Sequence, residues 1–255
     1  MTASPLRISV ITCTKNSERY VAQTLASVAA QTHPDVEQIF VDGGSTDGTL
    51  ELLRRQPGRT RIIERVSAGI SHAMNVGIDA SSGDVIAHLH SDDYYLHPGV
   101  LATVATTMQG TGCDWLFGRI VSDVDGRQVG EAFTAPRFSP RRLLRRNFVP
   151  HPAAFVRKEV FRRFGLFRED YRLAMDYEFW LRIAPHCSVC QLDEPLAAFR
   201  VHSGSASVQH WRESLREDFR ARFNHAPWWM WPEMGARYAA RRWLRRSEAR
   251  ACASR

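Results

Sequence analysis

"GDVIAHLHSDDYY", residues 83–95, places two adjacent aspartates, Asp92 and Asp93, directly after an apolar run. The run is typical of a buried strand. Two like charges at the end of such a strand repel each other. A divalent cation reverses that repulsion, because Mg²⁺ and Mn²⁺ prefer oxygen ligands, and Mg²⁺ is usually held by one or two carboxylates together with phosphate oxygens. The pair therefore indicates a metal that brings a phosphorylated substrate, with a simple turn cap as the structural alternative.

Strand and helix patterns alternate before this stretch. Strands are predicted at residues 7–13, 36–44, 61–64 and 84–91, and helices at 16–32, 45–56, 68–83 and 98–110. Such alternation with short turns predicts an α/β fold, with a mainly parallel sheet and helices on both faces. Ligands of these sheets bind at the carboxyl ends of the strands. Both the acidic pair and the "VDGGSTDGT" segment, residues 41–49, fall at such ends.

The pattern changes after residue 110. We expect two strands at 114–132 joined by a turn, a basic helix at 139–147, a helix at 175–184, and two further strands ending at His202. From residue 209 the sequence is helical and basic. The chain is therefore expected to form one domain over 1–208, divided into halves of about 1–110 and 111–208, and a helical, basic, Trp-rich C-terminal region over 209–255.

The 255 residues are 44% hydrophobic and 24% charged, which is ordinary for a globular protein. The formal net charge is +7, and Lys15 and Lys158 are the only lysines, so arginine carries the excess. This balance favours an anionic partner such as phosphate, nucleic acid or an anionic membrane. Because no nucleic-acid recognition motif accompanies the charge, no nucleic-acid partner is expected.

The first residues resemble neither a signal peptide nor a membrane span, and we expect a cytoplasmic protein. Five cysteines without a secretory signal argue for reduced thiols rather than a disulfide framework. The pair Cys187 and Cys190 has the spacing of half a zinc site, but no second pair stands at a matching distance. Small buried side chains are the favoured interpretation of these cysteines.

Two further acidic positions have both a structural and a functional interpretation. Asp42 closes a predicted strand before Gly43 and Gly44, where it could stabilise the turn or accept a hydrogen bond from a nucleotide. Asp176 begins an apolar helix, where it could be an N-cap, an ion-pair partner of Arg182, or a general base at a pocket rim. The residues alone leave these alternatives open.

Six segments in order resemble the family-2 glycosyltransferases, an inverting family with the nucleotide-diphospho-sugar transferase (GT-A) fold. They are "ISVITCTKNSERYVAQTLASVAAQT", "VDGGSTDGT", "GISHAMNVGI", "GDVIAHLHSDDYY", "MDYEFWLR" and "FRVHSGSAS", which together run from about Ile8 to Ser207. The "VDGGSTDGT" segment is especially similar to members that build bacterial surface polysaccharides. The resemblance implies a metal-dependent enzyme that moves a sugar from a nucleotide-diphospho-sugar, with UDP-sugars the commonest donors, to a saccharide or lipid-linked saccharide.

The resemblance also implies a role for each matched residue, with a donor-binding first half and an acceptor-binding second half. Asp176 would be the catalytic base and Asp93 the main ligand of Mn²⁺ or Mg²⁺. His151 would contact the acceptor, although a histidine in a turn between two prolines is the alternative. The implied donor-binding residues are Thr12, Asp42, Asp92, Arg200 and His202.

Two departures and two alternative functions accompany the resemblance. Met175 stands where the family often has Glu before the base, and "RVSAG", residues 65–69, replaces an acidic or Asn position. A catalytically silent module that binds nucleotide-sugars or docks at a membrane is one alternative. A sugar nucleotidyltransferase is another, but "TCTKNSERY" lacks the Gly- and Arg-rich phosphate loop expected after its first strand.

The tail from His225 combines tryptophans with an arginine-rich helix. A stripe of Ala236, Ala239, Ala240, Trp243 and Leu244 faces away from most of the arginines. This pattern is typical of a helix at a membrane surface, here through residues 226–250 at the inner face of the cell membrane. Packing of the same stripe against the catalytic domain or a second subunit is the alternative, and the oligomeric state is not predicted.

Overall fold

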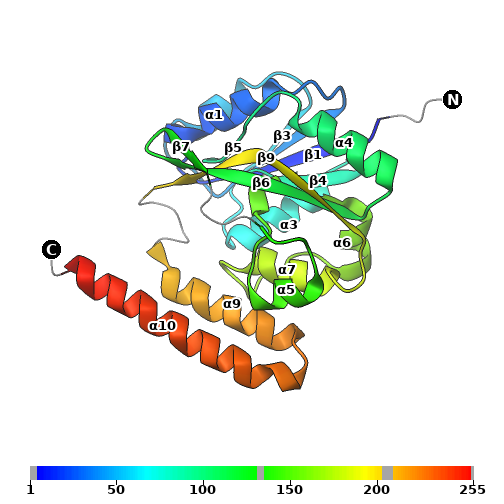
Figure 1. Cartoon of the computed structure of the whole chain (residues 1–255). Helices are drawn as coiled ribbons and strands as arrows, with labels where there is room; N and C mark the ends of the chain where they lie inside the picture. The colour runs from blue at the N-terminus through cyan, green and yellow to red at the C-terminus, as the bar shows by residue number, and fades with distance from the viewer. Residues whose placement is uncertain (1–4, 131–134, 203–208, 254–255) are drawn as a thin grey trace.

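The computed structural model describes residues 5–130, 135–202 and 209–253, with the backbone alone for 243–253. Figure 1 shows one sheet with helices on both faces and two long helices beside it. The first part of the chain contains β1 (Ile8–Thr14), α1 (Glu18–Ala29), β2 (Val36–Asp42), α2 (Thr49–Arg54), β3 (Thr60–Ile63), α3 (Ile70–Ala80), β4 (Val85–His88), β5 (Tyr94–Tyr95) and α4 (Val100–Thr111). The second part contains β6 (Trp115–Val124), β7 (Arg127–Gly130), α5 (Pro140–Arg145), the 3-10 turn η1 (His151–Ala153), β8 (Ala154–Arg157), α6 (Lys158–Phe164), α7 (Met175–Ile183), β9 (Val189–Val201), α9 (Trp211–His225), the 3-10 turn η2 (Trp228–Met230) and α10 (Trp231–Ala253).

The strands lie in the order β3-β2-β1-β4-β8-β6-β9-β5, with β7 paired to β6. Neighbours among β3, β2, β1 and β4 are parallel. Beyond them, β6 and β9 are parallel, whereas the β4–β8, β8–β6, β9–β5 and β6–β7 pairs are antiparallel. The predicted α/β class is confirmed, and the sheet is parallel through its first four strands and mixed thereafter.

The register of the parallel strands fixes where the first acidic residues lie. Thr14 pairs with Asp42 at the ends of β1 and β2, and Ile11 pairs with His88 at the end of β4. Because the carboxyl ends of parallel strands share one edge of a sheet, the loop that carries Asp92 and Asp93 lies beside the ends of β1 and β2.

A short antiparallel pairing brings a distant segment to that loop. Tyr94 pairs with Ala198 and Tyr95 with Ala197, which ties β5 to the last third of β9. The two strands predicted before His202 are one long strand, whose register against β6 shifts around Arg119, opposite Pro195. Proline has no N–H to donate to the ladder. An irregularity at this position therefore interrupts the hydrogen bonds between β6 and β9 without ending the strand.

The sheet has a hydrophobic core on each face. Helix α4 contributes Leu101, Val104 and Met108 to one core, against Val10, Ala87 and Leu116 of the sheet. The other core joins α3, α6 and α7 to the opposite side chains, and in it Trp115 of β6 stacks on Trp180 of α7 at 5.3 Å. Helix α7 is therefore anchored to the sheet by a fully buried aromatic pair.

The two C-terminal helices form a hairpin beside α7 (Figure 1). Helix α9 packs on α7, and α10 packs on α9 through ring contacts of Phe219 with Tyr238 at 4.6 Å and Phe223 with Trp231 at 4.2 Å. The alanine stripe, for which membrane contact and packing were the two predictions, is exposed at Ala236, Ala239 and Ala240. The side chains of Trp243 and Leu244, at the end of that stripe, lie outside the described residues.

Close packing of α3 on β1 gives a testable prediction. A Cβ at Gly77 would lie 2.4 Å from Ile11 Cγ2, whereas a Cβ at Gly110, a glycine of α4, would have nothing within 4 Å. We expect Gly77→Ala to lower the free energy of unfolding by about 1–3 kcal/mol through overpacking. Gly110→Ala should raise it by about 0.5–1 kcal/mol, because alanine favours the helix. Urea denaturation of both variants measures the difference, and equal effects would contradict the close approach of α3 to β1.

Candidate active site

A cavity of about 500 Å³ lies at the carboxyl edge of the parallel strands. Its walls come from the segments that follow β1 and β4, from η1, and from the segment that leads into α7. Asp92, Asp93, His151 and Asp176 all line it, so four of the predicted site residues share one cavity although up to 84 positions separate them along the chain.

Asp93 is almost completely buried, with 1% of its surface exposed. Its Oδ1 accepts a hydrogen bond from the backbone N–H of Arg200 at 3.0 Å, while its Oδ2 has no hydrogen-bond partner among the described residues. Burial, together with the charge of Asp92, raises the pKa of Asp93 well above its ordinary value, against the opposing effect of Arg200. A buried carboxylate oxygen without a donor is costly unless a cation or proton satisfies it.

Asp92 and the residues after β9 are joined in a network. Asp92 Oδ2 lies 3.0 Å from His202 Nε2, and its backbone carbonyl accepts a hydrogen bond from Arg200 Nε at 3.0 Å. The Arg200 guanidinium also lies 3.5 Å from an Asp123 carboxylate oxygen and 4.7 Å from the Tyr20 ring centre. The structure thus brings Arg200 and His202 to the acidic pair. Ser203 to Ser207 of the same predicted motif lie outside the described residues.

Thr12 and Asp42 are not among the residues that line the cavity. Thr12 is 2% exposed inside β1, and Cys13, Thr14 and Lys15 line the cavity in its place. Both Asp42 oxygens already accept hydrogen bonds, from Thr14, Ser45 and the backbone N–H of Gly44. Burial acts to raise the pKa of Asp42, but those hydrogen bonds lower it overall. Asp42 therefore organises the turn after β2, whose Gly43 lines the cavity.

Asp176 is the second residue of α7 and is partly buried, with 18% of its side chain exposed. Its Oδ1 accepts a hydrogen bond from the backbone N–H of Tyr177 at 2.7 Å. Burial raises the pKa of Asp176 to about 7, and the nearby charge of Asp218 acts in the same direction. A carboxylate with this pKa can take a proton from a hydroxyl and release it again near neutral pH. The alternative partner Arg182 pairs with Glu178 instead, at 3.0 Å.

The imidazole ring of His151, near Asp176, stacks with those of His88 and His90. The His151 ring lies 5.4 Å from that of His88 and 5.1 Å from that of His90, measured between ring centres. His151 Nδ1 is 3.9 Å from Asp176 Oδ2, which is too long for a hydrogen bond. Burial and the neighbouring imidazoles lower the pKa of His151 well below its ordinary value, so this ring is neutral and forms no ion pair with Asp176.

Sequence reasoning did not identify His88, His90, Lys15 or Arg172. His90, Lys15 and Arg172 line the cavity. The alternating histidines of "AHLHS" were the available signal, since residues two positions apart in an extended segment face the same side. Arg172 left no such signal, because it belongs to a segment with no regular pattern.

The described residues contain no group of three or more His, Cys, Asp or Glu side chains arranged to hold a metal ion. Cys187 is buried, and Cys190 is half-buried with its Sγ 3.3 Å from Thr111 Oγ1. If a metal binds in this cavity, the described residues supply a carboxylate or two, and the substrate and water must supply the remaining ligands.

The sequence is similar to known glycosyltransferases. A family model described as Glycosyl transferase family 2 matches residues 9–165. The chain is 33% identical over 222 residues to an uncharacterized glycosyltransferase of Mycobacterium tuberculosis, covering 78% of this chain and 82% of that protein. It is 32% identical over 185 residues to a PGL/p-HBAD biosynthesis glycosyltransferase of Mycobacterium bovis, covering 71% of this chain and 70% of that protein.

The fold is similar to that of solved structures with lower sequence identity. Staphylococcus aureus TarS 1-349 in complex with UDP-GlcNAc has a TM-score of 0.69 and 22% identity, over 85% of this chain and 66% of that one. This chain therefore spans slightly less than two thirds of that structure. Mannosyltransferase PcManGT from Pyrobaculum calidifontis, in complex with GDP-Man and Mn²⁺, has a TM-score of 0.69 and 19% identity, over 92% of this chain and 70% of that one. These likenesses confirm the predicted GT-A-type fold.

Proposed function

The chain belongs to glycosyl transferase family 2 and is a glycosyltransferase, and we propose that it is a metal-dependent, inverting enzyme that uses a nucleotide-diphospho-sugar. The observation that carries the proposal is the shared cavity, which has a buried carboxylate at Asp93, with one oxygen that no described residue satisfies, and a carboxylate with a pKa of about 7 at Asp176. The first suits a cation, and the second suits a general base.

The residues present fit a divalent metal. Asp93 Oδ2 would be its main ligand, and Asp92 stands beside it with one oxygen engaged by His202. When bound, Mn²⁺ or Mg²⁺ would supply positive charge that stabilises the diphosphate as it leaves. The structurally similar mannosyltransferase solved with GDP-Man and Mn²⁺ supports the use of a divalent cation. Arg200 holds the loop of Asp92, and Lys15 adds a further cation to the cavity lining.

Asp176 would remove the proton from the acceptor hydroxyl. The oxygen then attacks the anomeric carbon as the bond to the diphosphate breaks, and the electron pair of that bond stays on the leaving group. A single base acting opposite the leaving group gives direct displacement with inversion. His151, held neutral by burial, would contact the acceptor without forming an ion pair with the Asp176 carboxylate. Residues 1–110 would hold the donor, and residues 111–208 would form the acceptor side.

Titration calorimetry tests this proposal directly. UDP, dTDP and GDP would each be titrated into the unaltered protein with and without Mn²⁺. We expect one nucleotide to bind, with an affinity that requires the metal, and that nucleotide defines the donor class. The relative in complex with UDP-GlcNAc makes UDP the first expectation. If none of the three binds under either condition, the proposal is wrong, and a docking module becomes the better interpretation.

The acceptor is proposed to be a saccharide or lipid-linked saccharide of a bacterial surface glycolipid or polysaccharide. The M. bovis relative, a PGL/p-HBAD biosynthesis glycosyltransferase, supports this class. No helix in the described part of the chain is long and apolar enough to cross a membrane. We propose that contact with the inner membrane face occurs through a surface of the protein.

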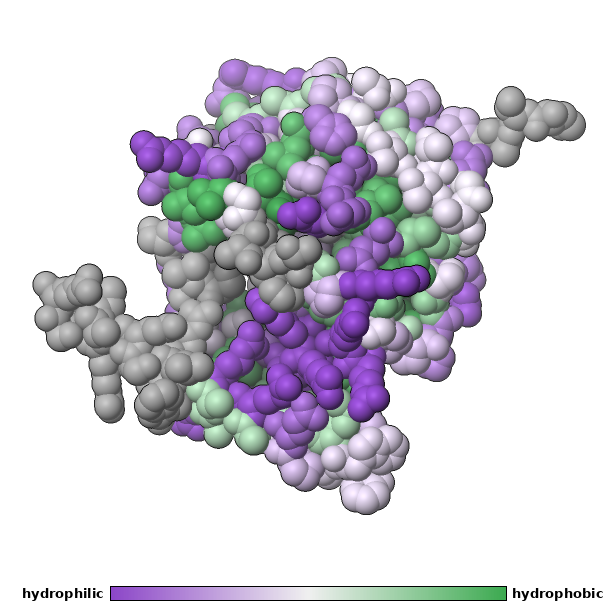
Figure 2. Space-filling model, in the orientation of Figure 1, coloured by the Kyte–Doolittle hydropathy of each residue, from purple (hydrophilic) through white to green (hydrophobic). Residues whose placement is uncertain are grey.

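The C-terminal hairpin offers such a surface. Trp228 and Trp229 are 72% and 66% exposed in the turn between α9 and α10, and the alanines of α10 named above are exposed as well. Figure 2 shows strongly hydrophilic side chains gathered over α5 and α9 on the same side of the molecule. Exposed tryptophans next to arginine-rich helices suit an anionic lipid surface.

We expect the protein to sediment with vesicles that contain phosphatidylglycerol and only weakly with phosphatidylcholine vesicles. The double substitution Trp228→Ala with Trp229→Ala should lower the vesicle partition coefficient about tenfold, because two side chains lose their apolar burial. Val129→Ala, which shortens an exposed apolar side chain on β7, is the matched control and should have no effect. Equal sedimentation of the double variant and the unaltered protein would refute membrane contact through this turn.

A further inference from the structure

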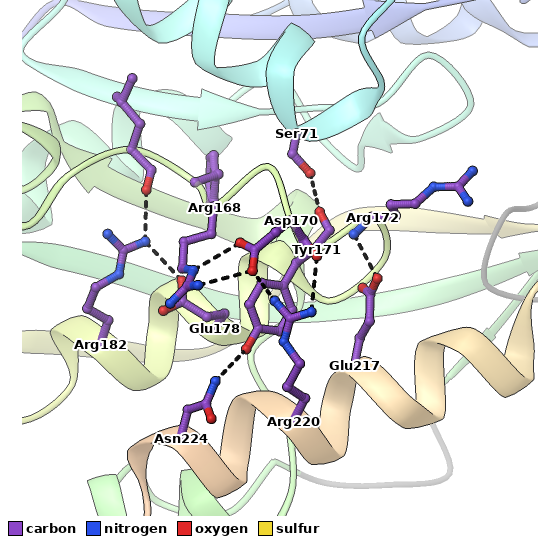
Figure 3. Close-up of polar contacts among 12 residues, drawn as sticks. Ser71, Arg168, Asp170, Tyr171, Arg172, Glu178, Arg182, Glu217, Arg220 and Asn224 are labelled. Carbon is purple, nitrogen blue, oxygen red and sulfur yellow. Dashed lines mark hydrogen bonds and ion pairs between the residues drawn. The ribbon is translucent and has the colours of Figure 1, made fainter.

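Glu217 of α9 makes an unusual set of contacts with the segment that precedes Asp176. Its carboxylate accepts hydrogen bonds from the backbone N–H groups of Arg172 at 2.9 Å, Leu173 at 2.7 Å and Ala174 at 2.9 Å. The side chain is 8% exposed, and Figure 3 shows it reaching from α9 to the backbone at Arg172. Three N–H donors directed at one buried carboxylate form a strong, charge-assisted cluster.

The three donors are the last three residues before α7. Ala174 is the N-cap of this helix and has no side chain that could accept a hydrogen bond from it. The first N–H groups of a helix have no partner within the helix and favour a negative charge. Glu217 supplies that charge from a different helix, 43 to 45 positions beyond the three donors along the chain.

The opposite side of the same segment forms part of the cavity wall. Arg172, Leu173, Met175 and Asp176 all line the cavity, while the N–H groups of the first two bind Glu217. A movement of Glu217 would therefore shift the cavity wall and the start of α7 together. The Asp176 carboxylate would move with them, because it is hydrogen-bonded to the N–H of Tyr177 in the first turn.

Helix α9 is itself fixed around Glu217. Asn224 donates a hydrogen bond to the Tyr171 hydroxyl at 3.2 Å, and the Arg220 guanidinium stacks on the Tyr171 ring at 3.9 Å (Figure 3). The Tyr171 carbonyl accepts a hydrogen bond from Ser71 at 2.6 Å, which links this cluster to α3. The next residue of α9, His225, contacts the buried Glu178 of α7 through its Nε2, at 3.1 Å. These contacts fix the part of α9 that carries Glu217 against Tyr171 and α7.

We propose that Glu217 is a positioning residue for the catalytic base, so that α9 is an integral part of the active site and not an appendage. This inference rests on the proposed function, in which Asp176 removes the acceptor proton. Glu217 acts through the backbone and makes no contact with substrate.

Glu217→Gln tests the proposal with a nearly isosteric change. Glutamine has one acceptor oxygen, and its NH₂ group would face at least one of the three N–H donors. The assay measures release of nucleoside diphosphate in the presence of Mn²⁺, with water as the acceptor. The donors are UDP-GlcNAc, GDP-mannose and a dTDP-sugar. The kcat of the variant should be about 30- to 100-fold lower than that of the unaltered protein, as expected for a base displaced by about 1 Å.

Calorimetry of the same variant separates positioning from loss of fold. The nucleotide should bind with the same stoichiometry and within about twofold of the original affinity, because the metal and donor residues lie on other segments. Amide hydrogen exchange should accelerate at residues 172–174 and not across the sheet.

Glu213→Gln is the matched control, since Glu213 is on the same helix and contacts the Arg172 side chain at 3.4 Å instead of the backbone. It should keep kcat within about twofold.

Glu217→Asp provides a second variant in case the glutamine variant does not fold. It retains the charge but shortens the reach, and kcat should lie between those of the unaltered protein and Glu217→Gln. The proposal is overturned if either folded variant, binding nucleotide at full stoichiometry, turns over donor as fast as the unaltered protein. If the unaltered protein turns over none of the donors, the proposed function itself is contradicted, and with it any role of Glu217 in positioning a base.

Discussion

Asp93→Ala is expected to remove metal-dependent nucleotide binding, with a loss of at least about 100-fold in affinity when Mn²⁺ is present. The reason is that Asp93 Oδ2, the proposed main metal ligand, is a buried oxygen that has no donor among the described residues. Without Mn²⁺ the variant and the unaltered protein should bind the nucleotide with similarly weak affinity. Calorimetric titration of UDP, dTDP and GDP with and without the metal measures both quantities.

Asp93→Asn separates the charge from the fold. Alanine removes the acceptor for the Arg200 N–H, and leaving that buried group unsatisfied costs about 1–3 kcal/mol of stability. Asparagine can keep this hydrogen bond through its oxygen while it loses the negative charge. Asp79→Asn, an exposed position of α3 outside the cavity, is the control for the loss of one charge. Retention of metal-dependent binding by both Asp93 variants would show that the acidic pair only shapes a turn.

The acidic pair and the parallel half of the fold were predictable because their signals are local. The alternation of apolar strands with capped helices specifies the parallel order, and the register places Asp92 and Asp93 at the strand edge. Asp176 was also recognisable, as the first charged residue of an apolar helix. Its pKa was not, because the burial that raises it comes from packing between distant segments.

Thr12 and Asp42 were predicted to bind the donor, but neither lines the cavity. Thr12 lies two positions before Thr14, which pairs with Asp42 at the strand end. Two residues of a strand span roughly 6.6 Å, enough to leave Thr12 inside the sheet while Thr14 reaches the cavity. Asp42 was placed correctly at its turn, but the sequence gives no indication that Thr14 and Ser45 already satisfy its oxygens.

The C-terminal hairpin was the least predictable part. Helical spacing identified an alanine stripe, but α10 packs through Trp231, Met234 and Tyr238, because aromatic and methionine side chains bury more apolar area than alanine. Glu217 had no recognisable pattern at all. Its partners are backbone N–H groups, which every residue except proline provides, so no residue type in the sequence marks the contact.

Asp176→Asn is expected to lower kcat about 1,000-fold, within the range by which a positioned base accelerates proton transfer. Asparagine can still accept the hydrogen bond from Tyr177 N–H, but it has no basic oxygen for the acceptor proton. Nucleotide affinity with Mn²⁺ should stay within about twofold, since Asp176 acts on the acceptor. Measurement of turnover and of nucleotide binding on one preparation distinguishes the loss of a base from the loss of the fold, and a variant that retains full turnover would exclude Asp176 as the base.

The pH dependence of the unaltered enzyme provides an independent check. The base must be deprotonated, and its pKa is about 7, so kcat should rise about tenfold per pH unit below 7 and level off above it. The groups around Asp176 are the neutral His151, the Tyr177 N–H and the charge of Asp218. Because Asp218 raises the pKa of Asp176, Asp218→Asn should move the midpoint to lower pH and leave the plateau unchanged. A midpoint that does not move, or moves to higher pH, would mean that a group other than Asp176 controls the profile.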